Sequence, residues 1–329
     1  MRLSAFSIVD QFPDSVAPGR DRYAEVVHLA EVSDAAGLSA LWVAEHHFQP
    51  GGTCPSPPVL LAACGARTTR LRLGVMVSVL PFHRPVDIAE EYALLDRLTQ
   101  GRVNLGVGSG YIPLEFEGFG LDPAEKRQRF EASLAWVREA FAGREVRAGE
   151  NSAGPVVLNV RPVQTPHPPI WIAAQRREAI PFVARQNFSV ALIPYATVTG
   201  LPELAGEIQE FRAALPPGSR AEVAIGLHLY AGPHPEQARA ALDRFLSSRL
   251  RTQSTFYQAK TSREPHHASR AGLEENDLAL LGSPREVLDR LEAFRRIGVD
   301  EVLGIFDFGG LPAEEVAQSV TALGRAWTP

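Results

Sequence analysis

The sequence is poor in cysteine and contains no long apolar run. Cys54 and Cys64 are the two cysteines among 329 residues, too few for the disulfide framework of a small secreted protein. Residues 1–13 carry one early arginine, and Asp10 interrupts their apolar stretch, so they predict neither a signal peptide nor a membrane-spanning helix. We therefore expect a cytoplasmic protein.

An excess of positive charge is also lacking. The formal net charge is -5 and no dense run of lysine and arginine occurs, which excludes an electrostatic basis for binding nucleic acid or an anionic membrane. The sequence lacks the GxGxxG fingerprint of dinucleotide-binding folds and the HExxH motif of zinc enzymes. We expect small molecules or proteins as partners, and no metal.

What the sequence does contain is a regular alternation of strand and helix patterns. Strand patterns occur at 3–9, 40–44, 70–80, 103–108, 169–174, 188–193, 222–230 and 299–306, and helical patterns at 21–36, 55–66, 85–99, 124–141, 177–187, 200–214, 234–250 and the C-terminus. About eight such units in a chain with 45% hydrophobic residues predict a TIM-type (β/α)8 barrel, formed as one domain over residues 1–329. A doubly wound sheet is the alternative, although it normally has fewer strands.

Two segments interrupt this alternation. Residues 144–168 are rich in glycine and proline and are expected to form an irregular insertion. Residues 251–282 are polar and poorly periodic. We interpret 251–282 as a lid, because long insertions on barrel enzymes often cover the active site, and a disordered excursion is the alternative.

The most informative segment is LWVAEHHF at residues 41–48. Four apolar residues break abruptly into Glu45, His46 and His47, which is typical of a buried strand that carries polar groups at its end. Parallel barrels place catalytic groups at the C-terminal ends of their strands, so these three residues are candidates for catalysis. The alternative is a structural histidine that only makes hydrogen bonds.

Other predicted strand ends would meet Glu45 and His46 at the same rim of the barrel. They comprise Ser78, Gly106 to Tyr111, Gln175 with Arg176, Tyr195, and Asp307 with Phe308. The convergence of several polar or glycine-rich strand ends is more specific than any one of them.

The order of these motifs resembles the bacterial luciferase-like family of flavin-dependent monooxygenases. The resemblance is carried by LWVAEHHF, then by SPPVLLAACGARTTRLRLGVMVSVLPFHRPVDIAEEYALLDRLTQGRVNLGVGSGY, and then by EFEGFG. It is dense over residues 38–135, looser over 169–195, and returns at 282–311.

The resemblance implies a TIM-type barrel that binds reduced FMN delivered by a separate flavin reductase and activates molecular oxygen as a flavin hydroperoxide. The family's catalytic histidine is the first of the EHH motif, which is His46 in this chain. A histidine suits proton transfer to or from a reacting oxygen group near neutral pH. Glu45 would then orient or tune His46.

The resemblance also implies the flavin-binding residues. The segment LGVMVSVLP matches one that carries a non-prolyl cis peptide beneath the flavin ring, which falls at Met76–Val77. The remaining cofactor-binding candidates lie at strand ends and comprise Phe6, Gly108, Ser109, Gly110, Tyr111, Ala174, Gln175, Arg176 and Arg177.

The flavin phosphate requires a separate prediction, because luciferase has an arginine at the position of Ser109. A phosphate that leaves water needs compensating donors. Gln175, Arg176 and Arg177 follow the fifth predicted strand and open a helix, so backbone N–H groups and an arginine could meet the phosphate there. The alternative is that both arginines are solvated surface charges.

The predicted reaction is the insertion of one oxygen atom into an organic small molecule, of an aromatic or polyketide-like kind. This class is suggested by aromatic residues near the predicted rim, namely Phe6, Phe48, Phe82, Phe116, Tyr195 and Phe308, and we add His47 to the substrate-binding candidates. Ordinary packing is the alternative role for these rings.

Two other functions are compatible with the resemblance. Relatives of the family use a reduced deazaflavin for hydride transfer, and some family members are non-catalytic partner subunits of heterodimers. The family also suggests a homodimer, to which the apolar face of the 85–99 helix would contribute, unless that face packs only against the barrel.

Overall fold

The structure is a computed structural model that describes residues 1–11, 19–49, 51–147, 154–256 and 269–327. Eight parallel strands form its centre: β1 (Arg2–Ser7), β2 (Ala40–Val43), β3 (Arg72–Val79), β4 (Val103–Gly108), β7 (Ile170–Ala173), β8 (Ser189–Leu192), β9 (Val223–Ala231) and β11 (Glu301–Ile305). Each strand pairs with the next one in this order, and β11 pairs with both β9 and β1. The sheet therefore closes on itself, which confirms the predicted TIM-type barrel.

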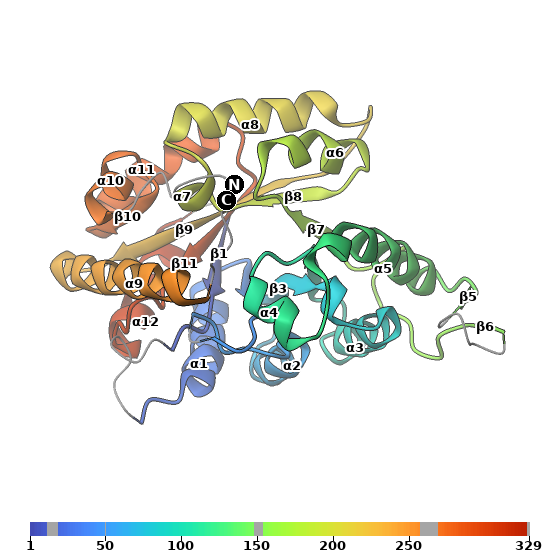
Figure 1. The fold of residues 1–329 in the computed structure, drawn as a ribbon. Helices are drawn as coiled ribbons and strands as arrows, with labels where there is room; N and C mark the ends of the chain where they lie inside the picture. The colour runs from blue at the N-terminus through green and yellow to red at the C-terminus, as the bar shows by residue number, and fades with distance from the viewer. Residues whose placement is uncertain (12–18, 50, 148–153, 257–268, 328–329) are drawn as a thin grey trace.

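Helices follow the strands and surround them (Figure 1). The longer ones are α1 (Arg22–Ala36), α2 (Pro57–Arg67), α3 (Pro85–Leu98), α5 (Lys126–Phe141), α8 (Leu201–Ala214), α9 (Pro235–Phe256), α11 (Pro284–Arg296) and α12 (Ala313–Ala326). Gly37 ends α1 in the left-handed conformation, with φ of 82°, as the sequence predicted. Trp327 Nε1 donates to the carbonyl oxygen of Met1 at 2.9 Å, so the first strand and the end of the last helix lie side by side.

Three further short helices escape sequence analysis. They are α4 (Pro113–Gly118), α7 (Pro194–Thr197) and α10 (Arg270–Glu275), while the predicted helix at 177–187 begins as a 3-10 turn at Arg177–Ala179 and continues as α6 (Ile180–Arg185). Segments of four to six residues are too short to show a helical period.

The predicted insertion at 144–168 contains a small antiparallel pair, β5 (Val146–Arg147) with β6 (Pro155–Val156). The structure corrects the bounds of the predicted lid at 251–282, and its role as a lid stays a prediction. Helix α9 continues to Phe256, and Ala279–Gly282 forms a further parallel strand, β10, along β9. Residues 257–268 of the predicted lid lie outside the described residues. No described helix is long and apolar enough to cross a membrane.

The lumen near the N-terminal ends of the strands is closed by polar and aromatic side chains. Glu301 accepts hydrogen bonds from Ser4 Oγ at 2.7 Å and from Trp42 Nε1 at 3.0 Å, and Arg2 donates to the same carboxylate at 2.8 Å. The rings of Trp42 and Trp171 meet edge to face at 5.8 Å. Because β2 and β7 are not neighbours in the sheet, these rings meet across the lumen and close its lower part.

Candidate active site

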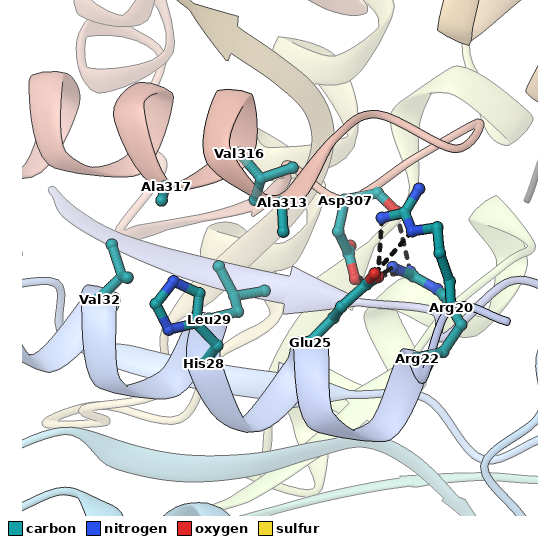
Figure 2. Close-up of a pocket in the computed structure, with 10 residues that line it drawn as sticks. All are labelled: Arg20, Arg22, Glu25, His28, Leu29, Val32, Asp307, Ala313, Val316 and Ala317. Atoms are coloured by element: carbon teal, nitrogen blue, oxygen red, sulfur yellow. Dashed lines mark hydrogen bonds and ion pairs between the residues drawn. The ribbon is translucent and has the colours of Figure 1, made fainter. Parts of the chain in front are cut away.

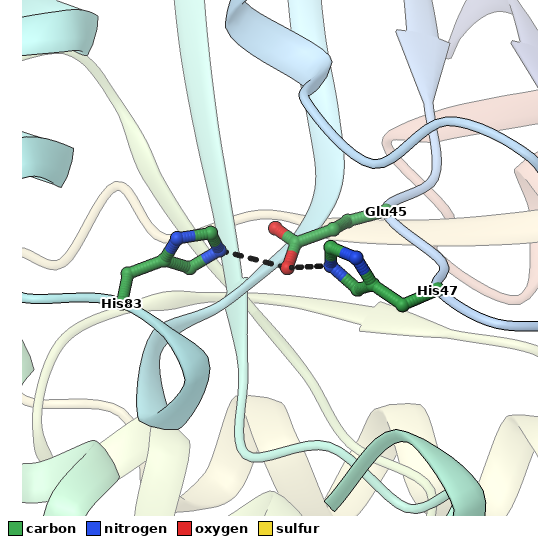
Figure 3. A group of neighbouring side chains, drawn as sticks. All are labelled: Glu45, His47 and His83. Atoms are coloured by element: carbon green, nitrogen blue, oxygen red, sulfur yellow. Dashed lines mark hydrogen bonds and ion pairs between the residues drawn. The ribbon is translucent and has the colours of Figure 1, made fainter. Parts of the chain in front are cut away.

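Glu45 lies at the centre of a buried hydrogen-bond network directly after β2. Its Oε1 accepts from His83 Nε2 at 2.8 Å and from His47 Nε2 at 3.1 Å (Figure 3). Its Oε2 accepts from Ser78 Oγ at 3.2 Å and from the backbone N–H of Val79 at 3.1 Å. The carboxylate thus joins the end of β2 to the end of β3.

This network keeps the Glu45 carboxylate ionised. Burial alone would raise its pKa, but hydrogen bonds and charge from His47 and His83 outweigh burial and lower the pKa to about 2. The same contact with Glu45 raises the pKa of His83 against the effect of its own burial. Glu45, His47 and His83 are also the group of described residues that could hold a metal ion, because their possible ligand atoms all lie within 4.8 Å of one another. We expect hydrogen bonding here rather than a metal, because both imidazoles already donate to the carboxylate.

His46 has a different carboxylate partner. Its Nδ1 lies 3.0 Å from Glu115 Oε1, and the same oxygen accepts the backbone N–H of His47 at 3.0 Å. Glu115 is buried and comes from α4, which sequence analysis missed. The expectation that Glu45 orients His46 is therefore wrong, because Glu45 contacts His47 and His83 instead.

The His46 ring is also held by its own loop. The backbone N–H of His46 donates to the carbonyl oxygen of Cys54 at 3.1 Å. A Cβ added at Gly52 would lie 2.4 Å from His46 Cδ2, so only glycine allows the loop to pass this close to the ring. Glu115 Oε1 already accepts the backbone N–H of His47, and a hydrogen donated to the same oxygen by Nδ1 of His46 would leave Nε2 as the acceptor nitrogen of the ring.

The predicted non-prolyl cis peptide is present at Met76–Val77. The register between β3 and β4 shifts between Val75 and Ser78. A Cβ at Gly106 would lie 2.2 Å from the carbonyl oxygen of Val75, and one at Gly108 would lie 2.6 Å from Val77 Cγ2. The two glycines of β4 are therefore needed for its close approach to β3 at this point.

The two arginines predicted to hold the phosphate have different surroundings. Arg177 pairs with Glu210 at 3.0 Å on the outer surface, so its charge is already engaged away from the barrel rim. Arg176 has no carboxylate partner among the described residues, and it lies close enough to Lys126 to affect its titration. Lys126 Nζ donates to the carbonyl oxygen of Gly110 at 3.3 Å, which places this lysine beside the loop after β4.

Lys126 is a positive group that sequence analysis missed. Burial lowers its pKa, and the nearby charge of Arg176 lowers it further. Lys126 opens α5, so its place at the start of a predicted helix was visible in the sequence, but its proximity to Gly110 and Arg176 depends on the barrel. Lys126 thus lies beside Gly110, the residue that follows Ser109, and near the charge of Arg176.

The predicted substrate-binding residues separate into two groups. His47, Phe48 and Phe82 gather around Phe119, with ring centroids 4.8, 5.5 and 4.7 Å from it, respectively. Phe48 is 58% exposed. Tyr195 and Phe308 instead flank His228, at 4.8 and 5.2 Å. Phe6 is buried on β1, and Tyr111 is partly exposed beyond β4.

A buried ion cluster joins the ends of β1 and β11. Arg22 Nη2 donates to Asp307 Oδ2 at 3.1 Å and lies 3.5 Å from Asp10 Oδ1, and Ser7 Oγ donates to Asp307. A hollow beside this cluster, between α1 and α12, is lined by Arg20, Arg22, Glu25, His28, Leu29, Val32, Asp307, Ala313, Val316 and Ala317 (Figure 2). Most of this lining belongs to the outer helices, so we interpret the hollow as a packing feature.

The fold and the rim define a barrel enzyme with a histidine–carboxylate pair at a strand end. The family model described as luciferase-like monooxygenase matches residues 1–301. The chain therefore belongs to the luciferase-like monooxygenase family and is an enzyme of that class.

Similar proteins agree with this assignment. The oxygenase component of a flavin-dependent trigonelline monooxygenase from Acinetobacter baylyi is 26% identical over 94% of this chain and 90% of its own length. A 4-hydroxyprotoasukamycin monooxygenase from Streptomyces nodosus subsp. asukaensis is 43% identical, over 36% of this chain and 32% of its own length. An uncharacterized protein, y4wF, from Sinorhizobium fredii is 37% identical over 59% of this chain, and the match spans 57% of that protein.

Solved structures share the whole fold. Monooxygenase RslO1 from Streptomyces bottropensis has a TM-score of 0.81 at 25% identity, with 98% of each chain covered. The oxygenating constituent of 3,6-diketocamphane monooxygenase from Pseudomonas putida, solved in complex with FMN, has a TM-score of 0.78 at 19% identity, covering 99% of this chain and 97% of its own. An F420-dependent secondary alcohol dehydrogenase has a TM-score of 0.74 at 16% identity, covering 98% of each chain. The last two likenesses concern the fold alone.

Proposed function

We propose that this chain is the oxygenase component of a two-component system that uses reduced FMN and molecular oxygen to oxygenate an organic small molecule. A separate flavin reductase would supply the reduced FMN, as the name of the Acinetobacter baylyi relative, an oxygenase component, suggests for that protein. When bound, reduced FMN would supply the electrons that activate oxygen, through a flavin hydroperoxide. The residues of this chain would bind the flavin, exclude water and move protons.

The observation that carries this proposal is the pair formed by His46 and Glu115 at the end of β2. Nδ1 of His46 lies 3.0 Å from Glu115 Oε1, and donation from Nδ1 to this carboxylate would leave Nε2 to take a proton from, or return one to, a reacting oxygen group. We assign His46 as the general acid or base, Glu115 as the residue that positions it, and Glu45 as the residue that fixes the neighbouring loops.

The rim also suits the phosphate of FMN. The charge of Arg176 acts unfavourably on Lys126, which itself lies beside Gly110, and a dianionic phosphate bound by both side chains would relieve that repulsion. Ser109 and the backbone N–H groups after β7 add neutral donors. Arg177 is not part of this proposal, because Glu210 already pairs with it. We therefore propose Lys126, Arg176 and Ser109 as the phosphate-binding residues.

The flavin ring would lie over the Met76–Val77 peptide, with Phe6, Gly108, Tyr111 and Ala174 as further contacts. The substrate would lie between the flavin and the aromatic side chains at the rim. We keep an aromatic or polyketide-like compound as the proposed substrate class. The name of the Streptomyces nodosus relative, which covers only part of this chain, is compatible with it.

The assembly proposed for this chain is a homodimer. Leu94 and Leu98 on α3 are 52% and 66% exposed, and Val59 on the neighbouring α2 is 71% exposed. The predicted apolar face of the 85–99 helix packs against the barrel through Ile88, Ala89 and Tyr92, so these exposed side chains would form the contact between the two copies.

The proposal is tested by measuring oxygen consumption with purified protein, FMN, NADH and a flavin reductase, and by anaerobic titration with reduced FMN. We expect tight binding of reduced FMN and no hydride transfer to or from a deazaflavin. Replacing His46 by alanine should leave flavin binding intact and lower coupled oxygenation about 10²–10⁴-fold, whereas His47→Ala should have a smaller effect. Binding of the deazaflavin alone, with hydride transfer and no oxygen consumption, would contradict the proposal.

A further inference from the structure

His228 is a buried histidine that the proposed flavin chemistry does not use. It is fully buried on β9, and within the described part of the chain neither Nδ1 nor Nε2 has a hydrogen-bond partner. Other buried side chains among the described residues leave one polar atom without a hydrogen-bond partner, whereas His228 leaves two. A buried polar group without a partner is costly, so a native protein keeps one where something else completes its hydrogen bonds.

The sheet register places the His228 side chain inside the barrel. Trp42 faces the lumen, because its ring meets Trp171 across the barrel. Trp42 is in register with Phe6, Phe6 with Ile305, and Ile305 with His228. Side chains in register on neighbouring strands share a face of the sheet. His228 therefore points into the lumen, in the C-terminal half of β9, which is the catalytic end of a parallel barrel.

Aromatic rings enclose this imidazole. The ring centroids of Tyr195, Phe245 and Phe308 lie 4.8, 5.0 and 5.2 Å from that of His228. These rings come from three different elements, and the guanidinium of Arg249 lies 5.0 Å from the centre of the Tyr195 ring. Flat apolar walls around one donor and one acceptor are the combination that selects a flat ligand with a polar substituent.

The imidazole acts in its neutral form. Burial, and then the charge of Arg249, lower the pKa of His228 to about 3. At neutral pH it therefore offers one N–H donor and one acceptor nitrogen rather than a charge. Such a group discriminates between ligands that carry a hydroxyl or carbonyl and those that do not, because a ligand without one leaves the buried nitrogens unpaired.

We propose that His228 is a specificity-determining residue that hydrogen-bonds a hydroxyl or carbonyl substituent of an aromatic substrate, with Tyr195, Phe245 and Phe308 holding its ring. This inference rests on the proposed function, since it names the substrate class of the same rim. In this role His228 only binds the substrate and takes part in no covalent step.

The test uses two probes that differ by one hydroxyl, 2-naphthol and naphthalene. Their affinities are measured by equilibrium dialysis with wild type, His228→Phe and His228→Gln, with and without saturating FMN. His167→Phe is the matched control, since this half-buried histidine lies before β7 and bonds Pro168. Affinity for FMN is measured on every variant.

We expect wild type and His167→Phe to bind 2-naphthol about three- to tenfold more tightly than naphthalene, the range for one neutral hydrogen bond. His228→Phe should lose that preference while still binding naphthalene, and His228→Gln should keep part of it. The inference is overturned if wild type shows no preference, or if folded His228→Phe keeps it. Because the wild-type comparison stands alone, the test holds even if a variant misfolds. Failure of all variants and wild type to bind FMN would instead count against the proposed function.

Discussion

Replacing Glu115 by glutamine tests how the structure positions His46. The carboxylate accepts from His46 Nδ1 and from the backbone of His47, both at 3.0 Å. A hydrogen bond to a charged group contributes about 1.5–3 kcal/mol and a neutral one about 0.5–1.5 kcal/mol. Glutamine keeps an acceptor of the same size but loses the charge, so we expect a loss of about 1–2 kcal/mol. That corresponds to a five- to thirtyfold lower turnover.

The assay is coupled oxygenation with a flavin reductase, measured together with the affinity for reduced FMN. The affinity should stay near that of wild type, because Glu115 contacts His46 and not the proposed phosphate residues. Glu117→Gln is the matched control, since Glu117 lies on the same short helix α4 but is exposed. Turnover of Glu115→Gln equal to that of Glu117→Gln would refute the role assigned to Glu115.

Three further predictions concern the phosphate, the acid stability and the assembly. Arg176→Ala and Lys126→Ala should each weaken binding of reduced FMN by about 1.5–3 kcal/mol, or ten- to a hundredfold, and leave the binding of riboflavin unchanged. Arg177→Ala should bind both flavins normally. If titration finds all three variants equal to wild type, the phosphate is bound elsewhere. The pKa of Glu45 is lowered from 4.5 to about 2 in the folded chain, so it stabilises the fold above pH 4.5, and this contribution is lost as the pH falls from 4.5 toward 2. At 1.36 kcal/mol per pH unit, the free energy of unfolding falls by about 3 kcal/mol. Urea unfolding measures this as the difference in unfolding free energy between wild type and Glu45→Gln. A difference that stays the same between pH 4.5 and pH 2 would contradict the prediction. Leu94→Glu with Leu98→Glu should convert a dimer to a monomer in light scattering without loss of fold, and a monomeric wild type at micromolar concentration would remove the dimer.

The sequence was sufficient to predict the barrel and the strand ends. The strand periods and the abrupt change from Ala44 to Glu45 are local signals, and the resemblance placed the cis peptide at Met76–Val77. The partners of the key side chains are not local. Glu115 meets His46 across 69 positions of sequence, from a helix of six residues that is too short to show a period.

Adjacency in sequence also misled the assignment of Glu45. Successive side chains on an extended chain point in different directions, so Glu45 meets His47, two positions away, and His83 on the next loop. The bounds of the predicted lid were too wide for a different reason. Ala279–Gly282 is a buried strand of only four residues, flanked in the sequence by polar residues, and its pairing with β9 identifies it.

The central claim, that this chain activates oxygen on reduced FMN, is tested most directly by rapid mixing. The protein is loaded anaerobically with reduced FMN and mixed with oxygenated buffer while the flavin absorbance is followed. We predict that a flavin hydroperoxide accumulates before oxidised FMN appears, in wild type and in Glu117→Gln alike. Direct conversion of reduced to oxidised FMN at the rate of free flavin, without that species, would contradict the account.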